Sequence, residues 1–337
     1  MSNGSAPVVH LCHVGLGPMG RRILGDFIRR GLGDVVAAID SDPELVGRRL
    51  PEFVPGAPDL EVLASIDEME PTRERPIALV TTCSDLPRCF ETFIDLLERG
   101  VDLVSSCEEL LYPTLRHPRL AEELDRVAHD NDCRILGTGI NPGFLMDTMP
   151  LVATALSQRI DRIEVLRAQD ASTRRVPFQA KIGATLDLEA FAARQRDGSL
   201  RHVGLGESLH LLADAIGLPL DEWDESLEPL IATEAMTCDL GPIPAGHARG
   251  VVQVARGRRA DGRTIELEFR AAIGEPHPMD RIRILGEPDI ELAFRGGVHG
   301  DTGTSAVVLN AIPALRAAPP GLHTMATIRP CRWWQSV

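Results

Sequence analysis

In the first half of the chain, short apolar runs alternate with amphipathic stretches. The short apolar runs lie at 8–14, 35–39, 77–82, 101–106 and 134–137. The amphipathic stretches lie at 21–30, 87–99 and 120–131. Short buried runs predict strands, whereas apolar side chains that recur every three or four residues predict helices. This alternation predicts an α/β fold with a parallel, doubly wound sheet in the N-terminal part.

The pattern changes after about residue 150. Apolar and polar residues then alternate strand-like at 160–169, 251–256, 264–272 and 281–285. Strands this close in sequence predict an antiparallel or mixed sheet, and hence a second α+β domain. The apolar stretch 304–318 is helix-like and is expected to fold back on the first domain. We therefore expect domains over 1–150 and 151–300, a returning segment over 301–337, and a ligand between the domains.

A glycine-rich turn follows the first predicted strand. Gly15, Gly17 and Gly20 form G-x-G-x-x-G, with Pro18 and Met19 between the last two glycines. The first glycine permits the tight turn, the second lets the backbone approach a pyrophosphate, and the third lets helix and strand pack closely. The N-terminus of the following helix offers free N–H groups to phosphates. The motif indicates a Rossmann dinucleotide-binding domain, although a purely structural turn has the same form.

The acidic residue Asp40 ends the next apolar run, about 20 residues after Gly20. A carboxylate at this place accepts hydrogen bonds from a ribose 2′-OH and repels a 2′-phosphate, which favours NAD(H). Arg48 lies close enough in sequence to reach such a phosphate, so NADP(H) stays open as the cofactor. Thr82, which ends the run over 77–82, and Cys83, which follows it, are further candidate cofactor contacts.

Composition excludes several classes of function. The 337 residues suffice for two domains, and the net charge of −14 argues against a broad nucleic-acid or anionic-lipid surface. The seven cysteines form no C-x-x-C pair and do not predict a disulfide scaffold. Met1–Pro7 does not have the form of a signal peptide, and no stretch has the roughly 20 apolar residues of a membrane span. A cytoplasmic protein is expected.

The first candidate for chemistry is the segment 105–113, which follows a predicted buried strand. It places Cys107, Glu108 and Glu109 at the carboxyl end of that strand. A carboxylate facing a nicotinamide there can hold or move a proton, although both glutamates also suit the start of a helix. Cys107 could act as a nucleophile, but no activating histidine lies nearby in sequence, so a packed thiol is favoured.

The second candidate is the segment 137–147, where proline and glycine end a predicted strand. The Asn141 side chain can cap a helix or bind a ligand. Pro142 belongs to the same turn, and Phe144 could line an apolar pocket or fill the core.

The third candidate comprises Arg175, Phe178, Lys181 and His202. The two cations could bind a carboxylate, and His202 could donate a hydrogen bond to substrate; solvated surface is the alternative. His10, Cys12 and His13 do not predict a metal site, because alternate residues of a strand point to opposite faces.

Together these segments resemble the 2,4-diaminopentanoate dehydrogenase family, which includes native amine dehydrogenases and has a dihydrodipicolinate-reductase-like fold. The resemblance spans most of the chain and lies in Gly15–Gly20, Ser106–Leu110 with Tyr112-Pro113, Gly137–Phe144 with Met146-Asp147, Lys181–Gly183, His202–Ser208 and Asn310–Pro313 with Pro320–Leu322. The paired histidine, lysine and Ser-Gly-Thr cluster of true dihydrodipicolinate reductases is absent.

The resemblance implies reversible, NAD(P)-dependent oxidative deamination of an amine, which in reverse joins a ketone and ammonia. It implies a homodimer and a catalytic carboxylate at Glu108, and leaves open whether Glu109 shares that role. Lys181 is a rival catalyst by analogy with amino-acid dehydrogenases that use lysine. A carboxylate about 4 Å from a cationic iminium would stabilise it by roughly 4 kcal/mol at an effective dielectric of 20. A substrate such as 2,4-diaminopentanoate and a simple aliphatic or alicyclic amine both stay open. The competing functions are a C–O or semialdehyde oxidoreductase and a regulator without turnover.

Overall fold

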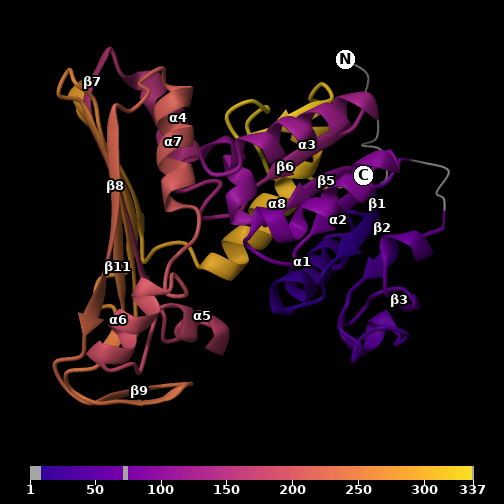
Figure 1. Cartoon of the computed structure of the whole chain (residues 1–337), viewed down its shortest axis with the longest axis horizontal. Helices are drawn as coiled ribbons and strands as arrows, with labels where there is room; N and C mark the ends of the chain where they lie inside the picture. The colour runs from indigo at the N-terminus through magenta and orange to yellow at the C-terminus, as the bar shows by residue number, and fades with distance from the viewer. Residues whose placement is uncertain (1–8, 71–74, 336–337) are drawn as a thin grey trace. The chain divides into compact units, whose positions relative to one another are not determined.

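The computed structural model describes residues 9–70 and 75–335, so Met1–Pro7 and Val8 lie outside the described residues. Its internal contacts divide the chain into two compact units (Figure 1). The first unit comprises Met1–Phe144 and Gly300–Val337, and the second comprises Leu145–His299.

The first unit is built on a parallel sheet of seven strands in the order β15-β6-β5-β4-β1-β2-β3. All of its strand pairs are parallel. The strands are β1 (Val9–Val14), β2 (Gly33–Ile39), β3 (Val62–Leu63), β4 (Ile77–Val80), β5 (Asp102–Ser105), β6 (Arg134–Gly137) and β15 (Gly321–His323). The predicted parallel sheet is confirmed, and the carboxyl ends of its strands form one edge where ligands bind in such folds.

Four helices pack against this sheet. They are α1 (Pro18–Arg29), α2 (Leu86–Glu98), α3 (Pro118–Asp130) and α8 (Gly300–Arg316). The buried apolar residues of α2 and α3, among them Phe93 and Leu124, form one core cluster with Cys12 and Val14 of β1. The other two helices, α1 and α8, contact each other and further strands of the sheet. The segment 300–316 therefore belongs to the first unit, although the whole of the second unit precedes it in sequence.

The second unit contains a mixed sheet of six strands in the order β14-β13-β7-β12-β11-β8. Strands β7 and β12 are parallel, and every other pair in this sheet is antiparallel. The strands are β7 (Arg159–Asp170), β8 (Glu222–Ile231), β11 (Ala248–Arg258), β12 (Thr264–Ala272), β13 (Met279–Glu287) and β14 (Ile290–Arg295). A separate hairpin pairs β9 (Met236–Cys238) with β10 (Gly241–Ile243). The predicted mixed or antiparallel sheet is confirmed.

Helices pack against the mixed sheet and complete the core of the second unit. They are α4 (Thr148–Ala153), α5 (Val176–Lys181), α6 (Leu188–Arg196) and α7 (Leu205–Ala215). Helix α7 packs on β11 and β12, where Leu209 and Leu212 join Leu267 and Phe269 in the buried cluster. Short 3-10 turns occur in the chain at Leu50–Glu52, Ile66–Glu68, Glu108–Leu111, Pro113–Leu115 and Thr154–Leu156.

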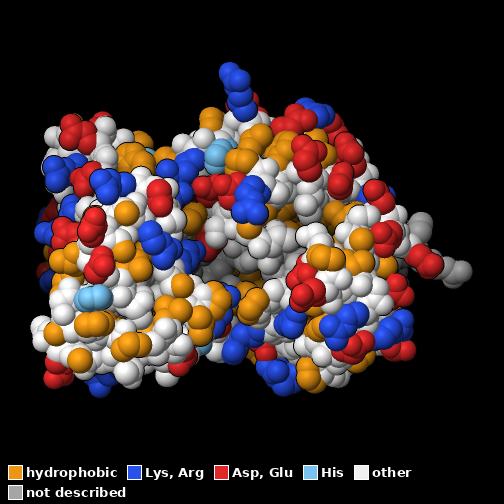
Figure 2. Space-filling model, turned by 60° about the horizontal axis from the view of Figure 1, so that its bottom comes forward, with side chains coloured by type: hydrophobic (Ala, Val, Ile, Leu, Met, Phe, Trp, Pro, Cys, Tyr) orange, Lys and Arg blue, Asp and Glu red, His pale blue; other side chains and the backbone are white. Residues whose placement is uncertain are grey.

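The charged side chains of the surface are intermixed. Figure 2 shows acidic and basic groups interspersed over the visible face, without a continuous basic stripe. This distribution agrees with the excess of acidic residues, 49 against 35 basic ones. None of the helices in the described ranges has both the length and the apolar character that crossing a membrane requires.

Candidate functional site

The glycine turn between β1 and α1 is shaped by close backbone contacts. Gly15 has a φ of +96°, and a Cβ atom there would lie 2.9 Å from the carbonyl carbon of Thr81. A Cβ atom on Gly20 would overlap the carbonyl oxygen of Gly15. At Gly17, no atom of the described residues lies within 4 Å of the corresponding position. The first and third glycines are therefore required by packing, whereas Gly17 borders open space, as an approaching pyrophosphate needs.

Two side chains beneath the turn hold it in place. The Thr81 hydroxyl donates a hydrogen bond to the carbonyl oxygen of Gly15 at 2.8 Å, and His13 Nε2 lies 3.1 Å from the same oxygen. His13 is fully buried, and burial lowers its pKa to about 4. The imidazole is therefore neutral at physiological pH. The sequence pattern did not indicate this role for either residue. The contact of Thr81 with the turn forms only when β4 pairs with β1.

The predicted ribose ligand Asp40 lies directly beside the glycine turn. Its Oδ2 atom accepts the N–H of Leu16 at 2.5 Å, and its Oδ1 atom accepts the N–H of Asp42 at 2.9 Å. These bonds fix the carboxylate at the end of β2, where a ribose hydroxyl can reach its remaining lone pairs.

The candidate phosphate ligand Arg48 is paired with Glu52. The Arg48 Nη2 atom lies 2.7 Å from a Glu52 carboxylate oxygen, and the guanidinium also lies 4.5 Å from the centre of the Phe53 ring. Arg21, in the first turn of α1, contacts the same ring at 5.0 Å. A 2′-phosphate would compete with Glu52 for Arg48.

The adjacent carboxylates Glu108 and Glu109 differ in their surroundings. Both lie in the 3-10 turn that follows β5. Glu109 is buried, and its Oε2 atom accepts the N–H of Leu86 at 2.9 Å and lies 3.0 Å from His117 Nε2. Glu108 is half-buried. Glu109 thus anchors the first turn of α2, and Glu108 is the more accessible of the two carboxylates.

The thiol of Cys107 is buried, in line with the packed-thiol interpretation. Its Sγ atom donates to the carbonyl oxygen of Ser84 at 3.3 Å.

The last residue of β6 packs tightly against the turn that carries Glu108, and a glycine-containing loop follows it. A Cβ atom on Gly137 would lie 2.5 Å from the carbonyl carbon of Leu110, so only glycine permits this approach. Gly143 has a φ of +125° and lies against the backbone of Gly139. The loop between them contains a cis peptide bond before Pro142.

Asn141 has the clearest unfilled hydrogen-bonding capacity in this loop. Both polar atoms of its amide are buried, and neither has a hydrogen-bond partner among the residues that the structure describes. A buried amide without partners is unfavourable by about 1–3 kcal/mol, which a ligand that donates and accepts would offset. Pro142 is buried and Phe144 is half-buried.

The second unit holds the remaining candidate residues. Arg175 is exposed at the N-terminus of α5, whereas the neighbouring Arg174 is buried, bonds to Gln169 at 2.8 Å and stacks on Phe178 at 3.9 Å. Lys181 ends α5. The sequence offered no means of telling which of the two adjacent arginines would be buried.

His202 is held by two elements of the mixed sheet. Gln253 Oε1 accepts the N–H of His202 at 2.7 Å, and Gln253 Nε2 donates to its carbonyl oxygen at 2.9 Å. The centres of the imidazole and the Phe269 ring are 4.2 Å apart, with the two rings tilted by 45°. Burial, followed by the positive charges of Lys181, Arg167 and Arg174, lowers the pKa of His202 well below its usual value. Its ring is therefore neutral, and its buried Nδ1 atom has no hydrogen-bond partner within the described ranges.

The segment after His202 is only partly a loop. Gly204, with a φ of +99°, precedes the first residue of α7, and Ser208 within that helix donates to Asp147 Oδ2 at 2.7 Å.

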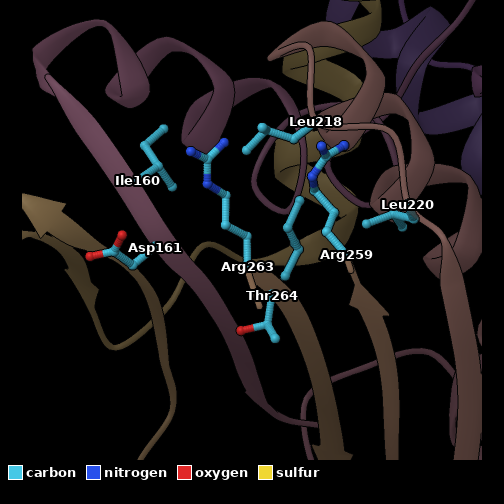
Figure 3. A pocket seen from close by; sticks show the side chains of 8 residues that line it. Ile160, Asp161, Leu218, Leu220, Arg259, Arg263 and Thr264 are labelled. Carbon is cyan, nitrogen blue, oxygen red and sulfur yellow. The ribbon is translucent and has the colours of Figure 1, made fainter. Parts of the chain in front are cut away.

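A small pocket lies elsewhere in the second unit and is lined by residues that include Ile160, Leu218, Arg259 and Arg263 (Figure 3). None of the candidate residues lines this pocket, so it takes no part in the candidate chemistry.

Comparison with known proteins gives the context for this geometry. A model of the 2,4-diaminopentanoate dehydrogenase C-terminal domain matches residues 144–334. A 2,4-diaminopentanoate dehydrogenase of Acetoanaerobium sticklandii is 28% identical over 322 residues, which cover 93% of this chain and 91% of that protein. An amine dehydrogenase of Streptomyces virginiae is 25% identical over 341 residues, which cover 92% of this chain and 93% of that protein.

The fold also has a close structural counterpart. The amine dehydrogenase from Mycobacterium smegmatis superposes with a TM-score of 0.85 at 24% identity, and the match covers 98% of each chain. The predicted fold class and family resemblance are thereby confirmed. Because the matched domain alone spans more than half of the sequence, the chain belongs to the 2,4-diaminopentanoate dehydrogenase family, a family of dehydrogenases that act on amines.

Proposed function

We propose that this protein catalyses the reversible, NAD(P)-dependent oxidative deamination of a small amine, with Glu108 as the catalytic carboxylate. One observation carries the proposal. Glu108 lies at the carboxyl end of β5, in a turn that packs against Gly137 at the end of β6, and the loop that follows β6 carries the buried amide of Asn141. Both groups belong to the edge of the parallel sheet at which nucleotides bind in such folds.

The first unit is suited to a nicotinamide dinucleotide. Gly17 precedes α1 without a side-chain cap, so the N–H groups of the first turn can bind a pyrophosphate. Asp40 favours the ribose hydroxyls of NAD(H), and Arg48 leaves NADP(H) as a second cofactor. A bound nicotinamide would exchange a hydride with the carbon that bears the amine. The proposed cofactor contacts are Gly15, Gly17, Pro18, Met19, Gly20, Asp40, Arg48, Thr82, Cys83 and Asn141.

Glu108 would stabilise a cationic intermediate and accept a proton. Loss of hydride from an amine leaves a cationic iminium, and a nearby carboxylate stabilises that cation more than it stabilises a neutral amine. In the reverse direction the same carboxylate would orient ammonia and accept its proton. Alcohol oxidation would instead require a hydrogen-bond donor to the carbonyl oxygen.

For the substrate, we propose a class of amine and the residues that contact it. Glu109, Asn141, Pro142 and Phe144 of the first unit, and Arg175, Phe178 and His202 of the second, are the proposed substrate contacts. The positive charges that act on His202 favour an amine that also carries a carboxylate, as 2,4-diaminopentanoate does. A simple aliphatic or alicyclic amine is the second candidate. A homodimer, by analogy with the family, and a cytoplasmic location, from the cysteine pattern of the sequence, complete the proposal.

Ammonium dependence tests the proposal directly. Purified protein would be given NADH or NADPH with 2-amino-4-oxopentanoate or small ketones, with and without concentrated ammonium. We expect cofactor oxidation only when ammonium is present, and loss of that activity in Glu108→Gln. Oxidation that proceeds equally well without ammonium would instead identify a C–O oxidoreductase. Binding of cofactor without turnover of any substrate would favour a regulator.

A further inference from the structure

Two thiols lie in contact at the start of α2. Cys83 belongs to the loop between β4 and α2, and Cys89 lies in the helix itself. Their Sγ atoms are 3.2 Å apart. Cys83 is half-buried and Cys89 is buried, so one thiol of the pair is accessible to a reagent. Neither thiol takes part in the proton transfer proposed for Glu108, and Cys83 is one of the proposed cofactor contacts.

The loop that carries Cys83 also supports the turn that carries Glu108. The carbonyl oxygen of Ser84 accepts hydrogen bonds from Cys107 Sγ and from the N–H of Glu109, each at 3.3 Å. The N–H of Leu86 donates to the Glu109 carboxylate at 2.9 Å. A displacement of residues 83–86 is therefore transmitted to Cys107 and Glu109, the two residues that flank Glu108.

The loop between β4 and α2 also contacts the glycine turn. Thr81 and Thr82 lie against Gly15, where an added Cβ atom would contact Thr82 Cγ2 at 3.1 Å. The Thr82 hydroxyl in turn lies 3.4 Å from Cys89 Sγ. The thiol pair thus lies within a continuous set of contacts that includes both the glycine turn and the turn bearing Glu108.

We propose that Cys83 and Cys89 form a reversible disulfide in exchange with a low-molecular-weight disulfide, and that this modification inactivates the enzyme. The accessible Cys83 thiolate attacks one sulfur of the small disulfide and releases one small thiol. The Cys89 thiolate then attacks the Cys83 sulfur of the mixed disulfide and releases the second small thiol. Two protein thiols are oxidised and one small disulfide is reduced to two thiols.

Formation of the bond requires movement of the loop. A disulfide brings its sulfur atoms to about 2.05 Å, so the present separation must shorten by roughly 1 Å. Cys89 is fixed within α2, whereas Cys83 belongs to a loop, so the loop takes up most of this movement. Displacement of a catalytic group by about 1 Å can lower the rate by as much as 100-fold.

The surroundings of the pair make exchange slow at neutral pH. The hydrogen bond with the Cys89 sulfur, together with burial, raises the pKa of Cys83. The hydrogen bond with Cys107 is the main cause that raises the pKa of Cys89 to about 11. Since the thiolate is the reacting form, these raised pKa values slow the exchange. The disulfide should therefore form under prolonged oxidative conditions and would not act as a rapid sensor.

The test uses the full-length protein with oxidised glutathione at pH 8.5, followed by alkylation, digestion with trypsin and mass spectrometry. Trypsin cleaves after Arg88, between the two cysteines, so the bond would join two peptides, one containing Cys83 and one beginning at Cys89. Cys107 lies in a third peptide. We expect the first two peptides to be cross-linked, with a loss of ammonium-dependent activity of about tenfold or more that dithiothreitol reverses.

Two variants complete the experiment. Cys89→Ser should keep the activity of the reduced enzyme and retain glutathione on Cys83 without an intramolecular bond. Cys238→Ser, which removes a half-buried thiol of the second unit, should respond as the parent does. A bond between Cys89 and Cys107, no bond at all, or a Cys83–Cys89 bond with unchanged activity would each overturn the proposal. Peptide mapping does not depend on turnover, so an error in the proposed amine chemistry would be recognised separately.

Discussion

Glu109 and His117 are joined by a contact of 3.0 Å between Oε2 and Nε2, while the same carboxylate oxygen accepts the N–H of Leu86. This arrangement uses one of two adjacent glutamates to hold α2 and the segment 108–117 together. It leaves Glu108 as the glutamate with the more accessible side chain. The two residues should therefore respond differently to removal of their charge.

Substitution of Glu109 by Gln should destabilise the protein. The variant loses charge-assisted hydrogen bonds in a buried position, for which a decrease in unfolding free energy of about 1.5–3 kcal/mol is expected. Glu108→Gln should lower the unfolding free energy by less than Glu109→Gln does, because the Glu108 side chain is half-buried whereas that of Glu109 is buried. Urea unfolding of the three proteins measures both effects. Equal destabilisation by the two substitutions would contradict the different roles assigned to these carboxylates.

The glycine turn allows a matched pair of substitutions. Gly20→Ala should lower the melting temperature, since its Cβ atom would overlap the Gly15 carbonyl oxygen. Gly17→Ala should leave the melting temperature unchanged, because no atom lies within 4 Å of its Cβ position. It should nevertheless weaken NADH binding about tenfold or more, because the methyl group would occupy space that the pyrophosphate needs. Thermal unfolding and fluorescence titration test the pair; normal NADH affinity in folded Gly17→Ala would place the cofactor elsewhere.

Cofactor preference should depend on Asp40. Asp40→Ser removes the negative charge that repels a 2′-phosphate, so the ratio of kcat/KM for NADPH to that for NADH should rise about tenfold or more. Affinity for NADH should fall at the same time, because the ribose loses a carboxylate acceptor. The measurement is the ratio for variant and parent at one ionic strength. Asp42→Ser, an exposed substitution nearby, serves as the control. An identical ratio in Asp40→Ser and the parent would show that Asp40 does not contact the ribose.

Stability should decrease in acid because of His13. Its pKa in the folded protein is lowered to about 4, below the ordinary histidine value of 6.5. The unfolded chain therefore binds a proton at higher pH than the folded protein, so stability is lost as the pH falls from about 6.5 to 4. The contribution of this residue over that range is of the order of 3 kcal/mol.

Unfolding curves between pH 7 and pH 4 measure this dependence. His13→Gln keeps a hydrogen-bonding side chain but cannot titrate, so its stability should vary less with pH than that of the parent. The remaining decrease would include His202, whose pKa is also lowered by burial. If parent and variant showed the same dependence on pH, His13 would not be the buried neutral group that the structure indicates.

Local sequence patterns determined a large part of the fold. The expected helices over 87–99 and 120–131 correspond to Leu86–Glu98 and Pro118–Asp130, and the predicted strand over 264–272 is found unchanged. The strand, glycine turn and helix from residue 9 to residue 29 were also predicted from local sequence. Periodicity, glycine and proline act through neighbouring residues, so a sequence reports them directly. The family segments, which span most of the chain, identified the class of enzyme.

Only the tertiary structure decided which chemical groups are engaged and which remain accessible. The sequence does not distinguish Glu108 from Glu109, because the partner of Glu109, the N–H of Leu86, comes from another element of the fold. Likewise, the bonds from Gln253 to His202 span 51 positions. Such pairs form only when strands and helices far apart in sequence come together. The sequence by itself therefore determined the architecture and the candidate chemistry, whereas long-range packing decided the role open to each side chain.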